Sequence, residues 1–151
     1  MRIMACYDGT DESREGLREA IKHAKAFDAE VLLVTSVPSH DKNYSDVVES
    51  VEKKLKAAQA LFDENSIICK THISYRGVDI SEGEDLVEFA RKELVDEVIL
   101  GIRTRTRVGK FLLGSVSQWV MLKAECPVIG VKKKMTTSDL DKGAFQDARQ
   151  I

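Results

Sequence analysis

Residues 95–117 read VDEVILGIRTRTRVGKFLLGSVS and contain one complete passage from strand to helix. The apolar run over 95–100 predicts a buried strand that ends at Gly101, and a basic loop then continues to Gly114. Ser115 and Gln118 have the S-x-x-Q spacing of a capping box, so we expect a helix to start there with Ser115 as its cap. Strand, loop and helix in this order form the unit from which parallel α/β sheets are built.

The same unit recurs along the rest of the chain. Apolar runs predict further strands over 2–7, 30–37, 67–74 and 127–131. The segments between them carry apolar residues at three- and four-residue spacing, which predicts amphipathic helices. We expect Thr10 or Asp11 to cap the first helix, and the S-x-x-E box at Ser81 to open the third. Five such strands separated by four helices predict a doubly wound parallel sheet covered on both faces.

Composition narrows the class of protein. The chain has 151 residues, which fits one domain, and its net charge of -2 argues against a nucleic-acid or membrane-surface binder. The apolar stretches are shorter than the roughly 20 residues that span a bilayer. Cys6, Cys69 and Cys126 are far apart, which excludes the spacing of a zinc site or a thioredoxin motif. The odd cysteine count and the absence of a secretion signal favour a reducing cytoplasmic location.

Positive charge is concentrated after the fourth predicted strand. Residues 98–124 contain five basic residues and no acid, so the rest of the chain carries -7. The basic residues are Arg103, Arg105, Arg107, Lys110 and Lys123. They lead into Gly114-Ser115 at the expected helix start, where free backbone N–H groups and the helix dipole favour a phosphate. The alternative is that these side chains form a solvated surface loop.

The common phosphate-binding motifs are absent from the sequence. Gly109-Lys110 resembles the end of a P-loop, but Phe111 stands where a serine or threonine would bind magnesium, and Thr104 stands at the first glycine. No G-x-G-x-x-G follows any predicted strand. A P-loop enzyme is therefore disfavoured.

Three features together resemble the universal stress protein family. They are Asp8 after the first strand, Gly101-x2-Thr104-x9-Gly114-Ser115, and the closing segment ECPVIGV over 125–131. The resemblance covers about residues 2–132. It implies a Rossmann-like three-layer sandwich, similar to adenine nucleotide alpha-hydrolases, with strand order 3-2-1-4-5. The polar composition of residues 135–151 predicts a loosely ordered tail or a short peripheral helix after a domain over 1–134.

The resemblance also implies a ligand and its contacts. In the nucleotide-binding branch of the family, ATP or AMP, with Mg²⁺ as an option, lies where strands 1 and 4 diverge. By position, the adenine would contact Cys6, Tyr7, Asp8 and Ser36, and the ribose would contact Leu100 and Gly101. The ribose and phosphates would contact Gly114, Ser115, Val116 and Ser117. A homodimer would form by pairing of the last strand, through Val128, Ile129, Gly130 and Val131.

Thr104 departs from the family motif, because it replaces the second glycine of G-x2-G-x9-G-[ST]. The site could take AMP, lose ATP, or shift its phosphate contacts to Arg103, Arg105 or Lys110. The leading hypothesis is a cytoplasmic regulatory dimer that binds an adenine nucleotide and acts on an unidentified protein partner. The alternatives are a dimeric interaction module without nucleotide and a slow ATP hydrolase, although no general base or metal cluster is visible apart from Asp8.

Overall fold

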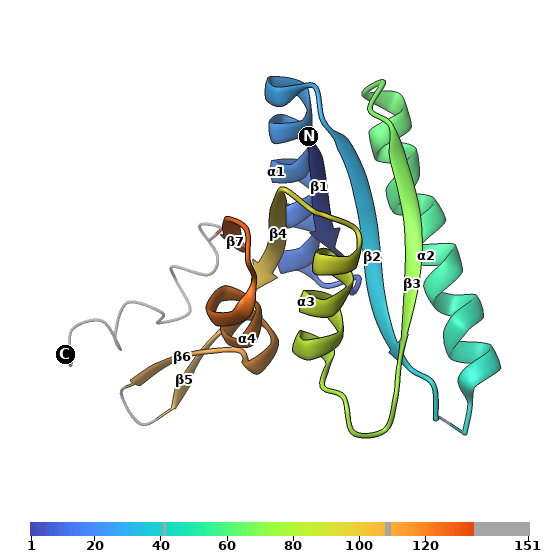
Figure 1. Cartoon of the computed structure of the whole chain (residues 1–151), viewed down its shortest axis with the longest axis vertical. Helices are drawn as coiled ribbons and strands as arrows, with labels where there is room; N and C mark the ends of the chain where they lie inside the picture. The colour runs from blue at the N-terminus through green and yellow to red at the C-terminus, as the bar shows by residue number, and fades with distance from the viewer. Residues whose placement is uncertain (41, 108–109, 135–151) are drawn as a thin grey trace.

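A five-stranded parallel sheet forms the centre of the protein (Figure 1). The computed structural model describes residues 1–40, 42–107 and 110–134, and only the backbone over 104–107 and 110–112. The sheet order is β3-β2-β1-β4-β7, which confirms the predicted topology. Its strands are β1 Arg2–Cys6, β2 Glu30–Pro38, β3 Cys69–Arg76, β4 Glu97–Ile102 and β7 Val128–Lys132.

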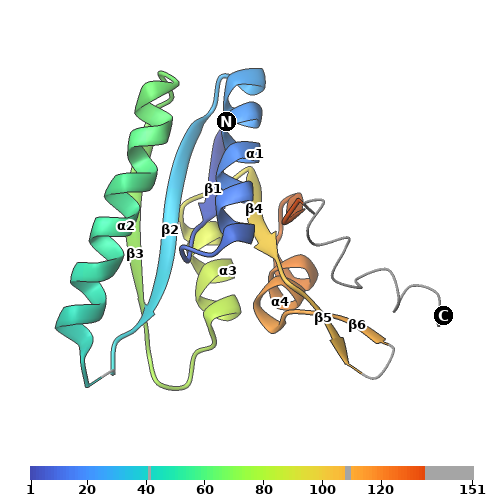
Figure 2. The ribbon, with the colours of Figure 1, turned by 180° about the vertical axis from the view of Figure 1, so that it is seen from behind.

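Four helices cover the two faces of this sheet (Figures 1 and 2). They are α1 Asp11–Phe27, α2 Tyr44–Glu64, α3 Glu82–Lys92 and α4 Ser115–Lys123. Side chains of β1 alternate between the faces: Ile3 and Ala5 pack with residues of α1 and α2, whereas Met4 packs with residues of α3 and α4. The two apolar cores are therefore separated by the sheet, as the near-continuous apolar strands predict. No described helix has the length and apolar character needed to cross a membrane.

The segment after β4 differs from the prediction. Instead of a loop, it forms an antiparallel hairpin of β5 Thr104–Arg107 and β6 Lys110–Leu113. Threonine alternates with arginine here, and β-branched residues favour extended backbone even where the composition is strongly charged. The predicted tail over 135–151 lies outside the described residues.

β1 is the middle strand and pairs on one side with β2 and on the other with β4. The chain leaves β1 for α1 and leaves β4 for the hairpin, so these two connections diverge from neighbouring strands at the same edge of the sheet. Ligands in open α/β sheets bind at such a point of divergence.

Candidate functional site

A cavity of about 480 Å³ opens where β1 and β4 diverge. Its described lining contains all the predicted nucleotide contacts except Thr104, whose side chain lies outside the described part of the chain. These contacts are Cys6, Tyr7, Asp8, Ser36, Leu100, Gly101, Arg103, Gly114, Ser115, Val116 and Ser117. The lining also includes residues that no sequence motif assigned to the site: Thr10, Ser13, Val34, Thr35, Glu82, Leu86 and Leu113.

Asp8 organises the turn that leaves β1. Its Oδ1 accepts hydrogen bonds from the Thr10 backbone N–H at 2.9 Å and from the Thr10 hydroxyl at 2.6 Å. Thr10 in turn caps α1 by accepting from the Ser13 N–H at 3.2 Å, as predicted. Partial burial alone would raise the pKa of Asp8, but the hydrogen bonds of this turn and the nearby Arg103 guanidinium hold it below its ordinary value. Asp8 is therefore an ionised carboxylate at the cavity rim.

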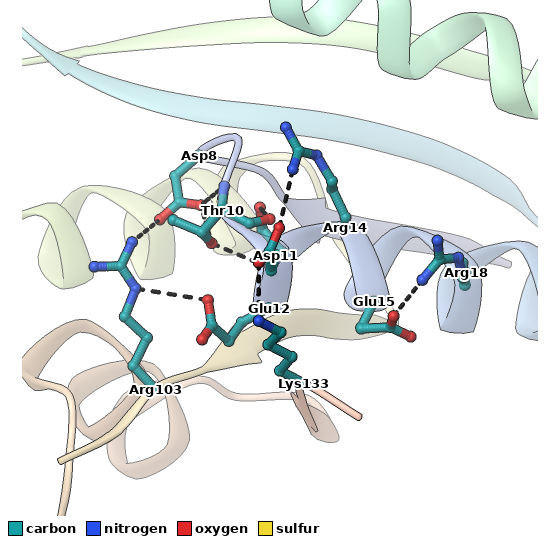
Figure 3. A network of polar contacts seen from close by, with 10 residues as sticks. Asp8, Thr10, Asp11, Glu12, Arg14, Glu15, Arg18, Arg103 and Lys133 are labelled. Atoms are coloured by element: carbon teal, nitrogen blue, oxygen red, sulfur yellow. Dashed lines mark hydrogen bonds and ion pairs between the residues drawn. The ribbon is translucent and has the colours of Figure 1, made fainter. Parts of the chain in front are cut away.

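Arg103 follows β4 and bridges back to the start of α1 (Figure 3). Its Nη2 lies 3.6 Å from Asp8 Oδ2, and its Nε lies 3.9 Å from Glu12 Oε2. Lys133, just beyond β7, lies 3.1 Å from Asp11 Oδ2. Asp8 and Glu12 therefore already balance part of the positive charge of Arg103, which was expected to bind an anionic ligand. Such partly exposed ion pairs contribute only about 0–1 kcal/mol each, so a phosphate can compete for Arg103.

Three helix N-termini reach the cavity, and in two of them side chains already cap the free backbone N–H groups. In α1, Thr10 is the cap and Asp11 and Glu12 occupy the first turn. In α3, the predicted capping box is present: Glu84 N–H donates to Ser81 Oγ at 3.3 Å, and Ser81 N–H donates to Glu84 Oε2 at 2.9 Å. Acidic side chains in these first turns balance the dipole and would repel an anion.

The N-terminus of α4 is different. Its cap residue is Gly114, which offers no side-chain oxygen, and its first turn contains no acid. The prediction that Ser115 caps this helix is wrong, because Gln118 N–H donates to Gly114 O at 2.9 Å and the helix begins one residue earlier than the box requires. Among the three N-termini, α4 is consequently the one whose backbone N–H groups suit an anion.

Two serines position the walls of the cavity. Ser117 is buried, and its hydroxyl lies 3.4 Å from the Gly101 carbonyl to which it donates, joining α4 to β4. Ser36 is also buried; its hydroxyl donates to Asp85 and accepts from Arg76 Nη1 at 2.9 Å. Ser36 therefore has no donor left for a ligand and can only accept.

Cys6 and Glu82 lie on the α3 side of the cavity. Burial raises the pKa of the Cys6 thiol to about 12, so this side chain is a neutral wall rather than a nucleophile. Burial also raises the pKa of Glu82, with Asp8 and Asp85 adding to the rise while Arg76 and Arg103 oppose it. Glu82 could not be placed in the site from sequence, because only the packing of α3 brings its first residue to β1.

The opposite pKa shifts of two glutamates in α3 give a test of this arrangement. A carboxyl whose pKa rises on folding costs the folded state free energy once the pH exceeds that pKa. We expect Glu82→Gln to raise the free energy of unfolding at pH 7 and to change it little at about pH 3.5, where both states are protonated. Denaturant unfolding at the two pH values measures the effect.

Glu84 is the matched control, because the Ser81 hydroxyl and backbone N–H hold its pKa below the ordinary value. Its contribution to stability is present above the unfolded-state pKa and disappears as the pH falls through the folded-state pKa. Glu84→Gln should therefore lower the free energy of unfolding at pH 7. If both variants changed the free energy of unfolding at pH 7 in the same direction, the environments assigned to the two carboxyls would be contradicted.

The fold and the position of the cavity define a Rossmann-like α/β domain with a cavity at the divergence of its central strands. The model of the universal stress protein family matches residues 1–132, and the chain belongs to this family. A curated universal stress protein of Methanocaldococcus jannaschii is 32% identical over 143 residues, covering 87% of this chain and 82% of the relative.

Solved structures support the same assignment. A universal stress protein from Archaeoglobus fulgidus is similar with a TM-score of 0.78 at 28% identity, covering 87% of this chain and 98% of that one. A structure of the universal stress protein from Archaeoglobus fulgidus in complex with dAMP has a TM-score of 0.70 at 27% identity over the same shares. The predicted family and fold are thus confirmed.

Proposed function

We propose that this chain is a regulatory protein that binds an adenine nucleotide, ATP or AMP, in the cavity between β1 and β4. The observation that carries the proposal is the contrast among the three helix N-termini, of which α4 alone lacks both a side-chain cap and first-turn acids. The cavity volume of about 480 Å³ lies within the usual range for small-molecule sites, roughly 300–1,000 Å³. The complex of a relative with dAMP supports the same ligand class.

The proposed orientation follows the charges. The phosphates lie at Gly114, Ser115, Val116 and Ser117, with Arg103 beside them, and the ribose lies along Leu100 and Gly101. The adenine lies against Cys6, Tyr7, Asp8 and Ser36. The described residues contain no cluster of three His, Cys, Asp or Glu able to hold a metal. With ATP, we therefore propose that Mg²⁺ enters bound to the phosphate oxygens.

The direct test is to denature the purified protein and identify released small molecules by mass spectrometry. It is followed by calorimetric titration with AMP, ATP plus magnesium, and adenosine. We expect AMP or ATP to bind more tightly than adenosine, because the phosphate adds charge-assisted hydrogen bonds at α4. Equal binding of AMP and adenosine would contradict the phosphate placement.

A second candidate is an interaction module without nucleotide, which the pairing of Arg103 with Asp8 and Glu12 favours. It predicts that no nucleotide is released and none binds on titration. Thr104→Gly restores the family glycine and separates the two cases, since a gain of ATP binding in this variant would identify a degenerate site.

We also propose a homodimer through β7. This strand pairs with β4 on one side and is the edge of the described sheet, with Val128, Ile129, Gly130 and Val131 only partly buried. Pairing with a second copy across a two-fold axis would satisfy its free backbone groups. Light scattering should give twice the molar mass of the chain, and a monomer mass would contradict this interface.

A further inference from the structure

Glu82 stands apart from the other acidic residue of the cavity lining. The carboxylate of Asp8 is occupied by Thr10 and Arg103. Glu82 also lines the cavity, but within the described part of the chain its carboxyl takes part in no hydrogen bond or ion pair. Because no described buried side-chain oxygen lacks a partner, the oxygens of Glu82 are accessible. An ionised carboxylate is an acceptor only, so Glu82 can accept a hydrogen bond from a ligand N–H or O–H in the cavity.

The surroundings of Glu82 indicate which part of a ligand that donor belongs to. Cys6 and Leu86, the latter one turn further along α3, supply apolar surface at this end of the cavity. The Ser36 hydroxyl donates to Asp85 and so offers only acceptor capacity. The two arginines at this end already have partners in the protein, Arg76 with Ser36 and Arg103 with Asp8. The remaining carboxylate, acceptor and apolar surface suits a flat heterocycle that carries an N–H donor.

We propose that Glu82 is a specificity-determining residue whose carboxylate accepts a hydrogen bond from the exocyclic amine of adenine. This inference rests on the proposed nucleotide function and deepens it. The ribose is placed along Leu100 and Gly101 of β4, which leaves the amine of the base as the donor for Glu82. Arg76, Arg103, Asp8 and Asp85 are the charged groups that act on this carboxyl, and the two arginines favour its ionised, accepting form.

The test compares two ligands and two proteins. AMP carries the 6-amine, and purine riboside 5′-monophosphate lacks it but is otherwise the same. Wild type should bind AMP about 10- to 100-fold more tightly, the usual range for a hydrogen bond to a charged group. Glu82→Ala should bind both ligands equally, and Glu82→Gln, which keeps an acceptor oxygen, should restore part of the preference.

Glu88→Ala is the matched control on the same helix, because Glu88 pairs with Arg91 and Lys92 and does not line this cavity. It should retain the full preference for AMP. A preference that survives in Glu82→Ala, or an equal loss for both ligands in that variant, would overturn the role of Glu82 and leave the nucleotide function standing. Failure of wild type to bind either ligand would overturn the proposed function and this assignment with it.

Discussion

Gly114→Asp should lose AMP affinity by about 100-fold or more while its affinity for adenosine stays unchanged, because the new carboxylate repels a phosphate and caps α4 in its place. The backbone of Gly114 has φ -57° and ψ 147°, which any residue adopts. A Cβ built there meets the Arg103 carbonyl at 3.9 Å, an ordinary contact. The variant should therefore fold normally, and calorimetric titration with both ligands measures the effect.

Gly114→Asn is the control for the charge. Asparagine caps helices about as well as aspartate but adds no negative charge. It should reduce AMP affinity less than Gly114→Asp, because it competes for the backbone N–H groups without repelling the phosphate. Unchanged AMP affinity in the aspartate variant would move the phosphate away from α4.

Gly101→Ala should destabilise the protein by on the order of 3 kcal/mol, at the upper end of the cost of overpacking. A Cβ at this position would lie 2.4 Å from the Glu12 carbonyl carbon and 2.6 Å from the Ser13 nitrogen. Both are backbone atoms of α1, so no side chain can rotate away and the helix itself must shift. For a chain of this size, thermal unfolding should occur roughly 6–12 °C lower.

Gly16→Ala tests the other side of the same contact. Its Cβ would meet the Gly101 nitrogen at 3.6 Å, which is ordinary van der Waals contact. Removing a glycine from the interior of α1 should then raise stability by about 0.5–1 kcal/mol. If Gly101→Ala and Gly16→Ala changed the stability equally, α1 and β4 would not approach each other as closely as described.

Local patterns were sufficient to predict the five strands and two of the helix starts, whereas the strand order was predicted from the family resemblance. The apolar runs define the strands, and the caps at Thr10 and Ser81 depend only on neighbouring residues. The same rule failed at Ser115, although its spacing to Gln118 is correct. The helix starts where the chain turns after β6, and that turn places Gly114 rather than Ser115 at the cap.

The remaining errors concern contacts between distant segments. The alternating Thr–Arg sequence was interpreted as a loop because its charge is conspicuous, whereas its backbone forms a hairpin. The role of Arg103 as an anion contact stays a prediction; what the sequence did not reveal is that the fold also brings Asp8 and Glu12 to it. Glu82 carries no motif, and its position in the cavity lining emerges only once α3 has packed against the sheet.

Of the five strands in this sheet, β1 comes first along the chain yet lies in the middle of the sheet, and this has a consequence for how the domain is made. As the chain leaves the ribosome, β1 can pair with β2 as soon as both have emerged, but its other edge stays open until β4 follows. The cavity is complete only after residue 117 has appeared. A nucleotide therefore cannot guide folding of the first half of the chain, and its binding can stabilise only a protein whose sheet is almost finished.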